Sequence, residues 1–597
     1  MCIRDRYLED LQKDTLLYSK NLQADIAISP LVFSKKIKIN ELEWNGVVAN
    51  VTRSKHTEKF NFSFLLDAFI TPEPKQPEDT TEALSLDIGS VSLTKFKVNY
   101  VDEFLGIESK NNIGSLHTQF ETINVEELLF HVNQLQLSNS TISYIQNSPL
   151  PAGNEDTSST LPQLVFTNIA LENVDARYHS IPDSILADIA VGQLTLGLPK
   201  IQLSTNTYEI DGLAIDNSKV LFELPQEPEN RTEKMATSAS NTFVWPDYNI
   251  NARNLNLKNN RFSFHKKTSS SVQNKFNPNN FDFSEIEFRA KTISYKPQHV
   301  NLDIEQLSFQ GNSDLNLNEF SLNGALNENQ LRLSNLVFKT SRSSLTGTAI
   351  INYSSIQSLI DSPKDVVVAL EIPSFTFDAR DIFVFEPSLE ANEILTNISE
   401  KPFTGQLFAQ GTLNEIALKN TAVKWGSQSS LKLKGSVFNS TYIDSLRVDF
   451  DSIIATTVLA DLNRFIPLKD STLTLPKQIQ LNGTASGSLK NLSTNIKLKT
   501  SMGGASFIGS GGLTTIPFIE GLLTIDSLQL GNLLNNPQFK DVSLTVDANL
   551  KGTELETLTG ELDATIIDFY WNNYVFTNLS ANAIIDQGTG EISLDYK

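Results

Sequence analysis

Residues 135–144 read Leu-Gln-Leu-Ser-Asn-Ser-Thr-Ile-Ser-Tyr, a ten-residue phrase of the form apolar-x-apolar-x-Asn-x-x-apolar-x-aromatic. The phrase returns, with asparagine at its fifth position, at residues 169–178 (IALENVDARY), 213–222 (LAIDNSKVLF), 255–264 (LNLKNNRFSF) and 416–425 (IALKNTAVKW). Looser copies occupy residues 91–100 and 331–340. The first four full copies begin 34, 44 and 42 residues apart, which indicates a structural repeat.

Each copy of the phrase predicts a strand, a tight turn and a second strand. Alternating apolar residues place every second side chain on one face, and asparagine tolerates the left-handed backbone that a turn needs. Such a unit cannot bury its apolar face alone and must stack on its neighbours. We therefore predict an all-β protein, an elongated repeat of antiparallel hairpins that forms an open, groove-like β-sheet tube. A multidomain β-sandwich with unrelated hairpins is the alternative.

Two kinds of segment interrupt the strand pattern. Loops are expected at residues 71–82, 147–160 and 225–241, because their Pro, Ser, Thr and charged residues cannot bury enough apolar surface to offset the cost of ordering. One or two short helices are expected at residues 379–399, which Pro387 splits, and at residues 354–361.

These interruptions predict a division of the chain into strand-rich segments. The predicted segments are β-repeats at 7–70, 83–146, 162–224 and 242–352, a short helical insertion at 353–400, and a glycine-punctuated, truncated β-repeat at 401–597.

Length and charge limit the function classes. A chain of 597 residues is too long for one compact core. The 69 acidic and 48 basic residues give a net charge of −21, and the basic residues form no cluster. Nucleic acid is therefore not an expected partner, because its binding needs gathered cations.

The two ends of the chain predict a fragment of a longer protein. The first six residues resemble translated adapter sequence and are set aside as an artefact, and they hold Cys2, the one cysteine. No stretch approaches the roughly 18 to 20 apolar residues of a membrane helix. Strand patterns run up to both ends, which indicates an N-terminal or middle fragment.

The sequence offers no catalytic, cofactor or metal site, so a non-enzymatic protein is predicted. The six histidines are far apart and never show metal-ligand spacing. The glycine-rich stretch 503–512 lacks the Lys-Ser/Thr of a phosphate-binding loop. In 483–487 (GTASG) the serine is one position late for a nucleophile elbow. Acidic pairs such as Glu41 and Glu43 lie on a polar strand face with no apolar pocket beside them.

Several runs resemble a known family. Residues 13–22 (KDTLLYSKNL), 37–51 (IKINELEWNGVVANV) and 60–69 (FNFSFLLDAF) are similar to the Bacteroidota-type translocation and assembly module (TamB) family of the AsmA-like superfamily. The glycine-punctuated strands at 405–413 and 481–489 are similar to strands of that superfamily. The resemblance covers residues 7–597, but it rests on strand patterns and carries no catalytic landmark.

The resemblance implies a function at the cell envelope. It implies a periplasm-spanning β-sheet tube with an apolar groove, which conducts phospholipid or supports outer-membrane protein assembly. The parent protein would be anchored in the inner membrane and would meet an outer-membrane barrel protein of the TamA/BamA type. Neither the anchor nor the module that meets this partner is recognisable in these residues.

The apolar positions of the phrase are the candidate groove-lining residues, with lipid acyl chains as the hypothetical ligand. An uncovered apolar face is a binding surface, although plain packing between strands would give the same alternation. The set is Leu135, Leu137, Ile142, Tyr144, Leu213, Ile215, Val220, Phe222, Leu255, Leu257, Phe262 and Phe264.

Two other functions compete with an envelope conduit. An extracellular β-repeat adhesin or surface protein would have closed, packed sandwiches. A carbohydrate-active β-helix enzyme would need regular coils and clustered carboxylates, and the irregular spacing of the phrase argues against it.

Overall fold

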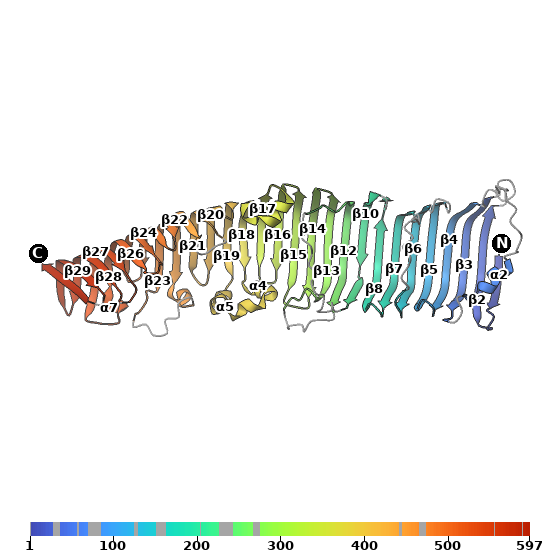
Figure 1. Cartoon of the computed structure of the whole chain (residues 1–597), viewed down its shortest axis with the longest axis horizontal. Coiled ribbons are helices and arrows are strands. Elements are labelled where there is room, and N and C mark those ends of the chain that lie inside the picture. Colours follow the sequence, from blue (N-terminus) through green and yellow to red (C-terminus); the bar gives the residue numbers. More distant parts are fainter. Residues whose placement is uncertain are drawn as a thin grey trace. The chain divides into compact units, whose positions relative to one another are not determined.

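The computed structural model confirms an all-β fold and divides the chain into unit 1 (Met1–Asn323) and unit 2 (Gly324–Lys597). In each unit the strands follow one another side by side (Figure 1). The structure describes residues 2–27, 36–55, 59–69, 85–124, 129–150, 163–202, 205–225, 243–266, 275–440, 445–464, 473–554, 556–587 and 589–596. The expected loop at 71–82 lies outside these residues, as do most of those at 147–160 and 225–241.

Unit 1 is an open sheet in which most neighbouring strands are antiparallel. Its elements are β1 (Cys2–Glu9), β2 (Thr15–Ala27), β3 (Lys36–Arg53), α2 (Ser63–Phe69), β4 (Ser85–Asp102), β5 (Ile107–Asn124), β6 (Leu129–Gln146), β7 (Gln163–Ser180), β8 (Ile185–Gly197), β9 (Lys200–Gln202), β10 (Thr207–Asp216), β11 (Lys219–Leu224), β12 (Asn249–Lys266), β13 (Asn280–Lys296) and β14 (His299–Gly311). The boundary between the units falls inside β15 (Asn316–Asn327).

Unit 1 also contains parallel neighbours, which the hairpin pattern does not predict. The strand β3 runs parallel to β4, β6 to β7, and β10 and β11 to β12. A parallel pair needs a connection that returns along the whole strand. The three predicted loops fall in these connections.

Unit 2 is an open sheet of antiparallel neighbours from β16 onwards. Its strands are β16 (Gln330–Thr340), β17 (Ser344–Asn352), β18 (Val367–Phe377), β19 (Phe403–Thr412), β20 (Glu415–Trp425), β21 (Ser429–Phe438), β22 (Arg447–Val458), β23 (Gln478–Ser488), β24 (Asn491–Thr500), β25 (Gly503–Gly512), β26 (Phe518–Gln529), β27 (Phe539–Lys551), β28 (Thr559–Trp571), β29 (Tyr574–Asp586) and β30 (Thr589–Tyr596).

Both predicted helical regions are helical. The first holds α4 (Arg380–Phe385), η3 (Pro387–Ala391) and α5 (Glu393–Ser399), and the second holds α3 (Ile356–Asp361), followed by η2 (Pro363–Asp365). Ser355 caps α3, because its side chain accepts a hydrogen bond from Ser358 N–H at 3.1 Å. The helices α2, α6 (Leu459–Leu462) and α7 (Leu530–Leu533) were not predicted, because one or two turns give no clear helical period.

The ten-residue phrase is not a strand-turn-strand unit, so that local prediction was wrong. The copy at 135–144 lies within β6, 169–178 within β7, 255–264 within β12 and 416–425 within β20; 213–222 spans β10 and β11. The predicted left-handed backbone is present. The fifth residues have positive φ: Asn139 49°, Asn173 51°, Asn217 53°, Asn259 51° and Asn420 48°.

The left-handed residue is a β-bulge, and the bulge explains the spacing of the phrase. In a regular strand, positions 1 and 3 of the phrase would face away from positions 8 and 10, because an odd number of residues separates the first pair from the second and side chains alternate between the faces. One extra residue restores a common face. The register shift between Leu257 and Asn260 in the β12–β13 pair marks this extra residue.

The bulges of parallel neighbours are bonded to one another. Asn259 Nδ2 donates to Asn217 Oδ1 at 2.7 Å, and Asn173 Nδ2 donates to Asn139 Oδ1 at 3.3 Å. The next strand must make room for the bulge: a Cβ at Gly114 would lie 2.4 Å from the carbonyl oxygen of Asn139. The bulges are thus fixed at the same level in adjacent strands.

Replacing Asn259 with alanine should lower the stability of unit 1 by about 1–2 kcal/mol, because alanine resists the left-handed region and the amide bond to Asn217 is lost. Asn259→Gly should cost less, because glycine accepts positive φ. The midpoint of urea unfolding measures the effect. Asn256→Ala, in the same strand, is the matched control, and an equal loss there would refute the assignment.

Candidate functional site

The twelve candidate groove-lining residues lie on one face of unit 1. Residues in register on neighbouring strands point to the same side of a sheet, and the registers join the candidates across β6, β7, β8, β10, β11, β12, β13 and β14. We call the result the apolar face. Its four rows are Leu135–Ile169–Leu196–Leu213–Leu255–Ala290–Ile304, Leu137–Leu171–Leu194–Ile215–Leu257–Phe288–Leu307, Ile142–Ala176–Ile189–Val220–Phe262–Phe283 and Tyr144–Tyr178–Ala187–Phe222–Phe264–Phe281.

The apolar face has side-to-side packing but no second layer among the described elements. Leu255 is 8% exposed and forms a small core with Ala252 and Ala290. The other eleven candidates are neither buried nor fully exposed. Each strand contacts chiefly its neighbours in the sheet. The described part of unit 1 is therefore a single sheet, not a closed sandwich.

One end of the apolar face is aromatic. Tyr144 and Tyr178 stack with their ring centroids 5.6 Å apart. Phe264 lies 5.6 Å from Phe281, which lies 4.8 Å from Phe283. The rings of β13 were missed from the sequence because that strand lacks the phrase. Their alternation, FDF at 281–283, was the signal that could have found them.

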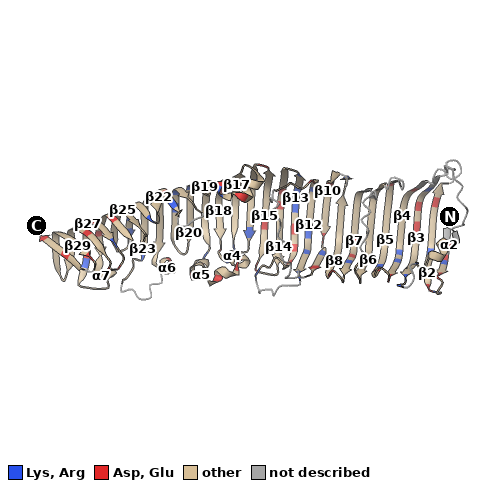
Figure 2. Ribbon diagram, viewed as in Figure 1, with Lys and Arg blue, Asp and Glu red and all other residues tan. Residues whose placement is uncertain are grey.

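The opposite face of unit 1 carries charge. Arg177 stands between Ala176 and Tyr178 and so projects from the other side of the sheet. It donates to Asp188 from Nε at 2.6 Å and from Nη2 at 2.8 Å, and its pKa is raised by these hydrogen bonds. Figure 2 marks the Lys and Arg residues along the strands in blue and the Asp and Glu residues in red. One side of the sheet thus suits water and the other suits hydrocarbon.

Unit 2 contains an apolar hollow of about 490 Å³. It lies at the ends of β16, β18 and β20 and the starts of β17 and β19, and only three of its lining residues carry a side-chain hydroxyl. The lining is Phe338, Ser343, Ser344, Leu345, Ile372, Phe375, Thr376, Phe377, Phe403, Leu407 and Val423. No candidate was named here from the sequence, although Val423 is the eighth residue of the full copy at 416–425.

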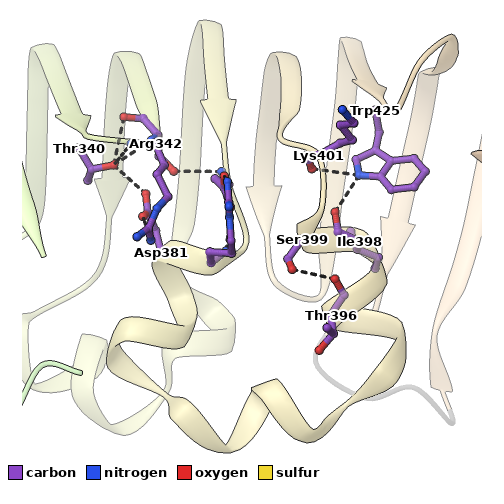
Figure 3. A network of polar contacts seen from close by, with 11 residues as sticks. Thr340, Arg342, Asp381, Thr396, Ile398, Ser399, Lys401 and Trp425 are labelled. Atoms are coloured by element: carbon purple, nitrogen blue, oxygen red, sulfur yellow. Dashed lines mark hydrogen bonds and ion pairs between the residues drawn. The ribbon is translucent and has the colours of Figure 1, made fainter. Parts of the chain in front are cut away.

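The helical insertion 378–402 connects β18 to β19 beside this hollow. At its first end, Asp381 accepts a hydrogen bond from Thr340 Oγ1 at 2.7 Å and one from Arg342 at 3.3 Å (Figure 3). Asp378, whose side chain is 3% exposed, binds Arg380 in a bidentate ion pair. Asp381 thus ties α4 to the end of β16, whereas the Asp378–Arg380 pair lies within the start of the insertion.

The second end of the insertion is held by Trp425, whose indole points at the C-terminal end of α5 (Figure 3). Its Nε1 donates to the carbonyl of Ile398 at 2.9 Å and to that of Lys401 at 3.1 Å. The last carbonyls of a helix have no partner within it, so the tryptophan supplies one. Its ring also lies 6.2 Å from Phe403, which lines the hollow.

Other chemistry is sparse in the described ranges. They hold no group of three or more His, Cys, Asp and Glu side chains placed to bind a metal ion. His131 lies 3.2 Å from Glu121. No described helix is long and apolar enough to cross a membrane.

Comparison with known proteins identifies no relative. No protein-family model matches the chain, and no curated protein or solved structure is significantly similar to it.

Acid should loosen the start of α4, where the Asp378 carboxylate binds Arg380. Burial raises the pKa of Asp378, but hydrogen bonds from the Arg380 side chain and backbone and the charge of Arg342 outweigh it, so the pKa lies below its ordinary 3.8. A lowered pKa stabilises the fold above the ordinary value, and this stabilisation is lost as the pH falls through the lowered one.

Hydrogen-exchange protection of α4 should thus be constant above about pH 5 and fall below about pH 4. Asp378→Asn should lower protection at neutral pH, by about 1–3 kcal/mol, and remove the acid dependence. Exchange with mass spectrometry measures both. Asp365→Asn, at an exposed carboxylate, is the control; an unchanged acid response in Asp378→Asn would contradict the assignment.

Trp425→Phe should loosen the C-terminal end of the helical insertion. The change keeps an aromatic ring but removes the indole N–H that donates to the carbonyls of Ile398 and Lys401. Exchange of the α5 amides should rise about fivefold, which corresponds to about 1 kcal/mol. The exposed Trp571→Phe is the matched control. Unchanged exchange in α5 would show that the indole N–H is dispensable.

Proposed function

We propose that this protein is a non-enzymatic envelope protein that conducts phospholipid or supports outer-membrane protein assembly. The observation that supports this proposal is the apolar face of unit 1, whose rows of mostly Leu, Ile, Val and aromatic side chains continue from β6 to β13 or β14 with no second layer over them among the described residues. An apolar face that no second sheet covers can bury a hydrophobic ligand.

The apolar face would act as the surface along which acyl chains lie. Burying a methylene group is worth about 0.8 kcal/mol, so one chain gains affinity from contacts along several strands. The rows cross the strands without a charged position, so a chain can shift along them with little change in free energy. The opposite face, with pairs such as Arg177–Asp188, would stay in water.

The envelope setting comes from the resemblance to the TamB family and from the alternating strands that carry it. On this basis we place the protein in the periplasm, with the parent protein anchored in the inner membrane and in contact with an outer-membrane barrel protein of the TamA/BamA type. An adhesin built of closed sandwiches suits the single-layer sheet of unit 1 less well.

The proposal predicts bound lipid. The full chain, purified without detergent and extracted with organic solvent, should release phospholipid on mass spectrometry, and it should transfer labelled phospholipid between liposomes. The double variant Ile215→Asp/Leu257→Asp puts two carboxylates in one row and should lower bound lipid at least fivefold, because it places charge where the chains lie.

The control for this variant is Ala214→Asp/Asn256→Asp. These residues are also in register, one step earlier in the same strands, and face the other side. Their replacement should leave the bound lipid unchanged. No bound lipid and no transfer by the unmodified chain would refute the lipid conduit, and equal losses in both variants would refute the role of the apolar face.

A further inference from the structure

The apolar hollow of unit 2 has a polar rim at one place. Ser343 lines the hollow, and its Oγ accepts a hydrogen bond from the backbone N–H of Asp378 at 3.0 Å. Phe377, the residue before, also lines it. The ion pair between Asp378 and Arg380 follows directly after Phe377 in the chain, where the helical insertion begins.

The accessible half of this ion pair is the cation. The side chain of Asp378 is 3% exposed, whereas that of Arg380 is 53% exposed. The hydrogen bonds to Asp378 come from Nε and Nη2 of Arg380. A guanidinium has five N–H donors, so the two on Nη1 remain for an incoming group.

We propose that the hollow binds one chain of an anionic amphiphile, with the chain among the phenylalanine rings and a carboxylate or phosphate head on Arg380. This inference rests on the proposed function and deepens it, because it names a discrete site and the charge of its ligand. The phenylalanine, leucine, isoleucine and valine side chains of the lining provide the hydrophobic contact. The guanidinium provides the charge-assisted hydrogen bonds that fix the head.

The size of the hollow fits a single chain. Its volume of about 490 Å³ lies in the lower part of the 300–1,000 Å³ range of small-molecule sites. The apolar face of unit 1 runs over many strands, and no helical insertion borders it among the described residues. The hollow, by contrast, is bordered by an insertion that two anchors hold in place. A chain would stop here, with its head at the insertion.

Trp425 reports on the site, because its ring lies 6.2 Å from Phe403 in the lining. The full chain with Trp44, Trp245 and Trp571 changed to Phe should show saturable quenching of Trp425 fluorescence by hexadecanoate brominated in mid-chain. Hexadecyl phosphate should displace it with similar affinity. Hexadecanol should bind at least tenfold more weakly, and hexadecyltrimethylammonium more weakly still. Equal affinities for the three charge types would overturn the anionic head.

Two variants locate the chain and the head. Leu345→Phe/Val423→Phe fills the hollow and should abolish quenching, whereas Ile454→Phe, on β22 and outside the hollow, should not. Asp378→Asn/Arg380→Gln removes the ion pair as a unit, so no buried charge is left alone. This double variant should weaken the binding of hexadecanoate at least tenfold and leave the affinity for hexadecanol unchanged. Arg380→Lys should retain part of the affinity for hexadecanoate.

The results separate this site from the proposed function. Unchanged quenching in the filled variant would overturn the site. If no amphiphile binds there while the full chain still carries and transfers phospholipid, the site is wrong and the conduit stands. If phospholipid is absent as well, the conduit fails too.

Discussion

The constraint on which this structure depends is the left-handed residue inside its long strands. A strand alternates its side chains strictly, so an apolar face survives over ten residues of this phrase only if one residue is added to the ladder. Without the bulge at Asn259, Phe262 and Phe264 would leave the face that holds Leu255 and Leu257. The Asn259–Asn217 and Asn173–Asn139 bonds keep neighbouring bulges level. Because the bulges are level, the rows stay in register from strand to strand.

Much of this could be predicted from the sequence, because it depends on local periodicity. Residue types and their spacing predict the all-β fold and the helices around Pro387. They also predict the positive φ of Asn139 and Asn420. The choice between turn and bulge could not be made. A turn and a bulge both use a left-handed asparagine between apolar pairs. They differ in whether the chain reverses its direction, and that depends on pairing with other strands. The parallel pairs were missed for the same reason, since direction is a property of two strands.

The parts that sequence reasoning missed depend on contacts between distant residues. Asp102, Asp378 and Asp461 are all buried near strand ends. Burial raises the pKa of Asp102, but the Arg53 side chain, the Leu105 N–H and the Tyr100 hydroxyl lower it by more. Asp461 accepts hydrogen bonds from the backbone of Ser427 and Gln428. In a strand-rich chain with 69 acidic residues, nothing local separates Asp102 and Asp461 from carboxylates on the solvated face, because Arg53 lies 49 residues from Asp102 and Ser427 lies 34 residues from Asp461.

The burial of the apolar residues differs from that in a packed sandwich. In a sandwich, side chains in the centre of the sheet are covered from above by the second sheet. In unit 1, Leu257, Ile215 and Leu194 lie in one row on adjacent strands and are all only half-buried. Their neighbours cover them from the sides, and the described elements leave them open from above. Apolar patches beyond a few hundred Å² are rare on proteins that work alone. In the proposed function, a mobile hydrophobic ligand would supply this cover.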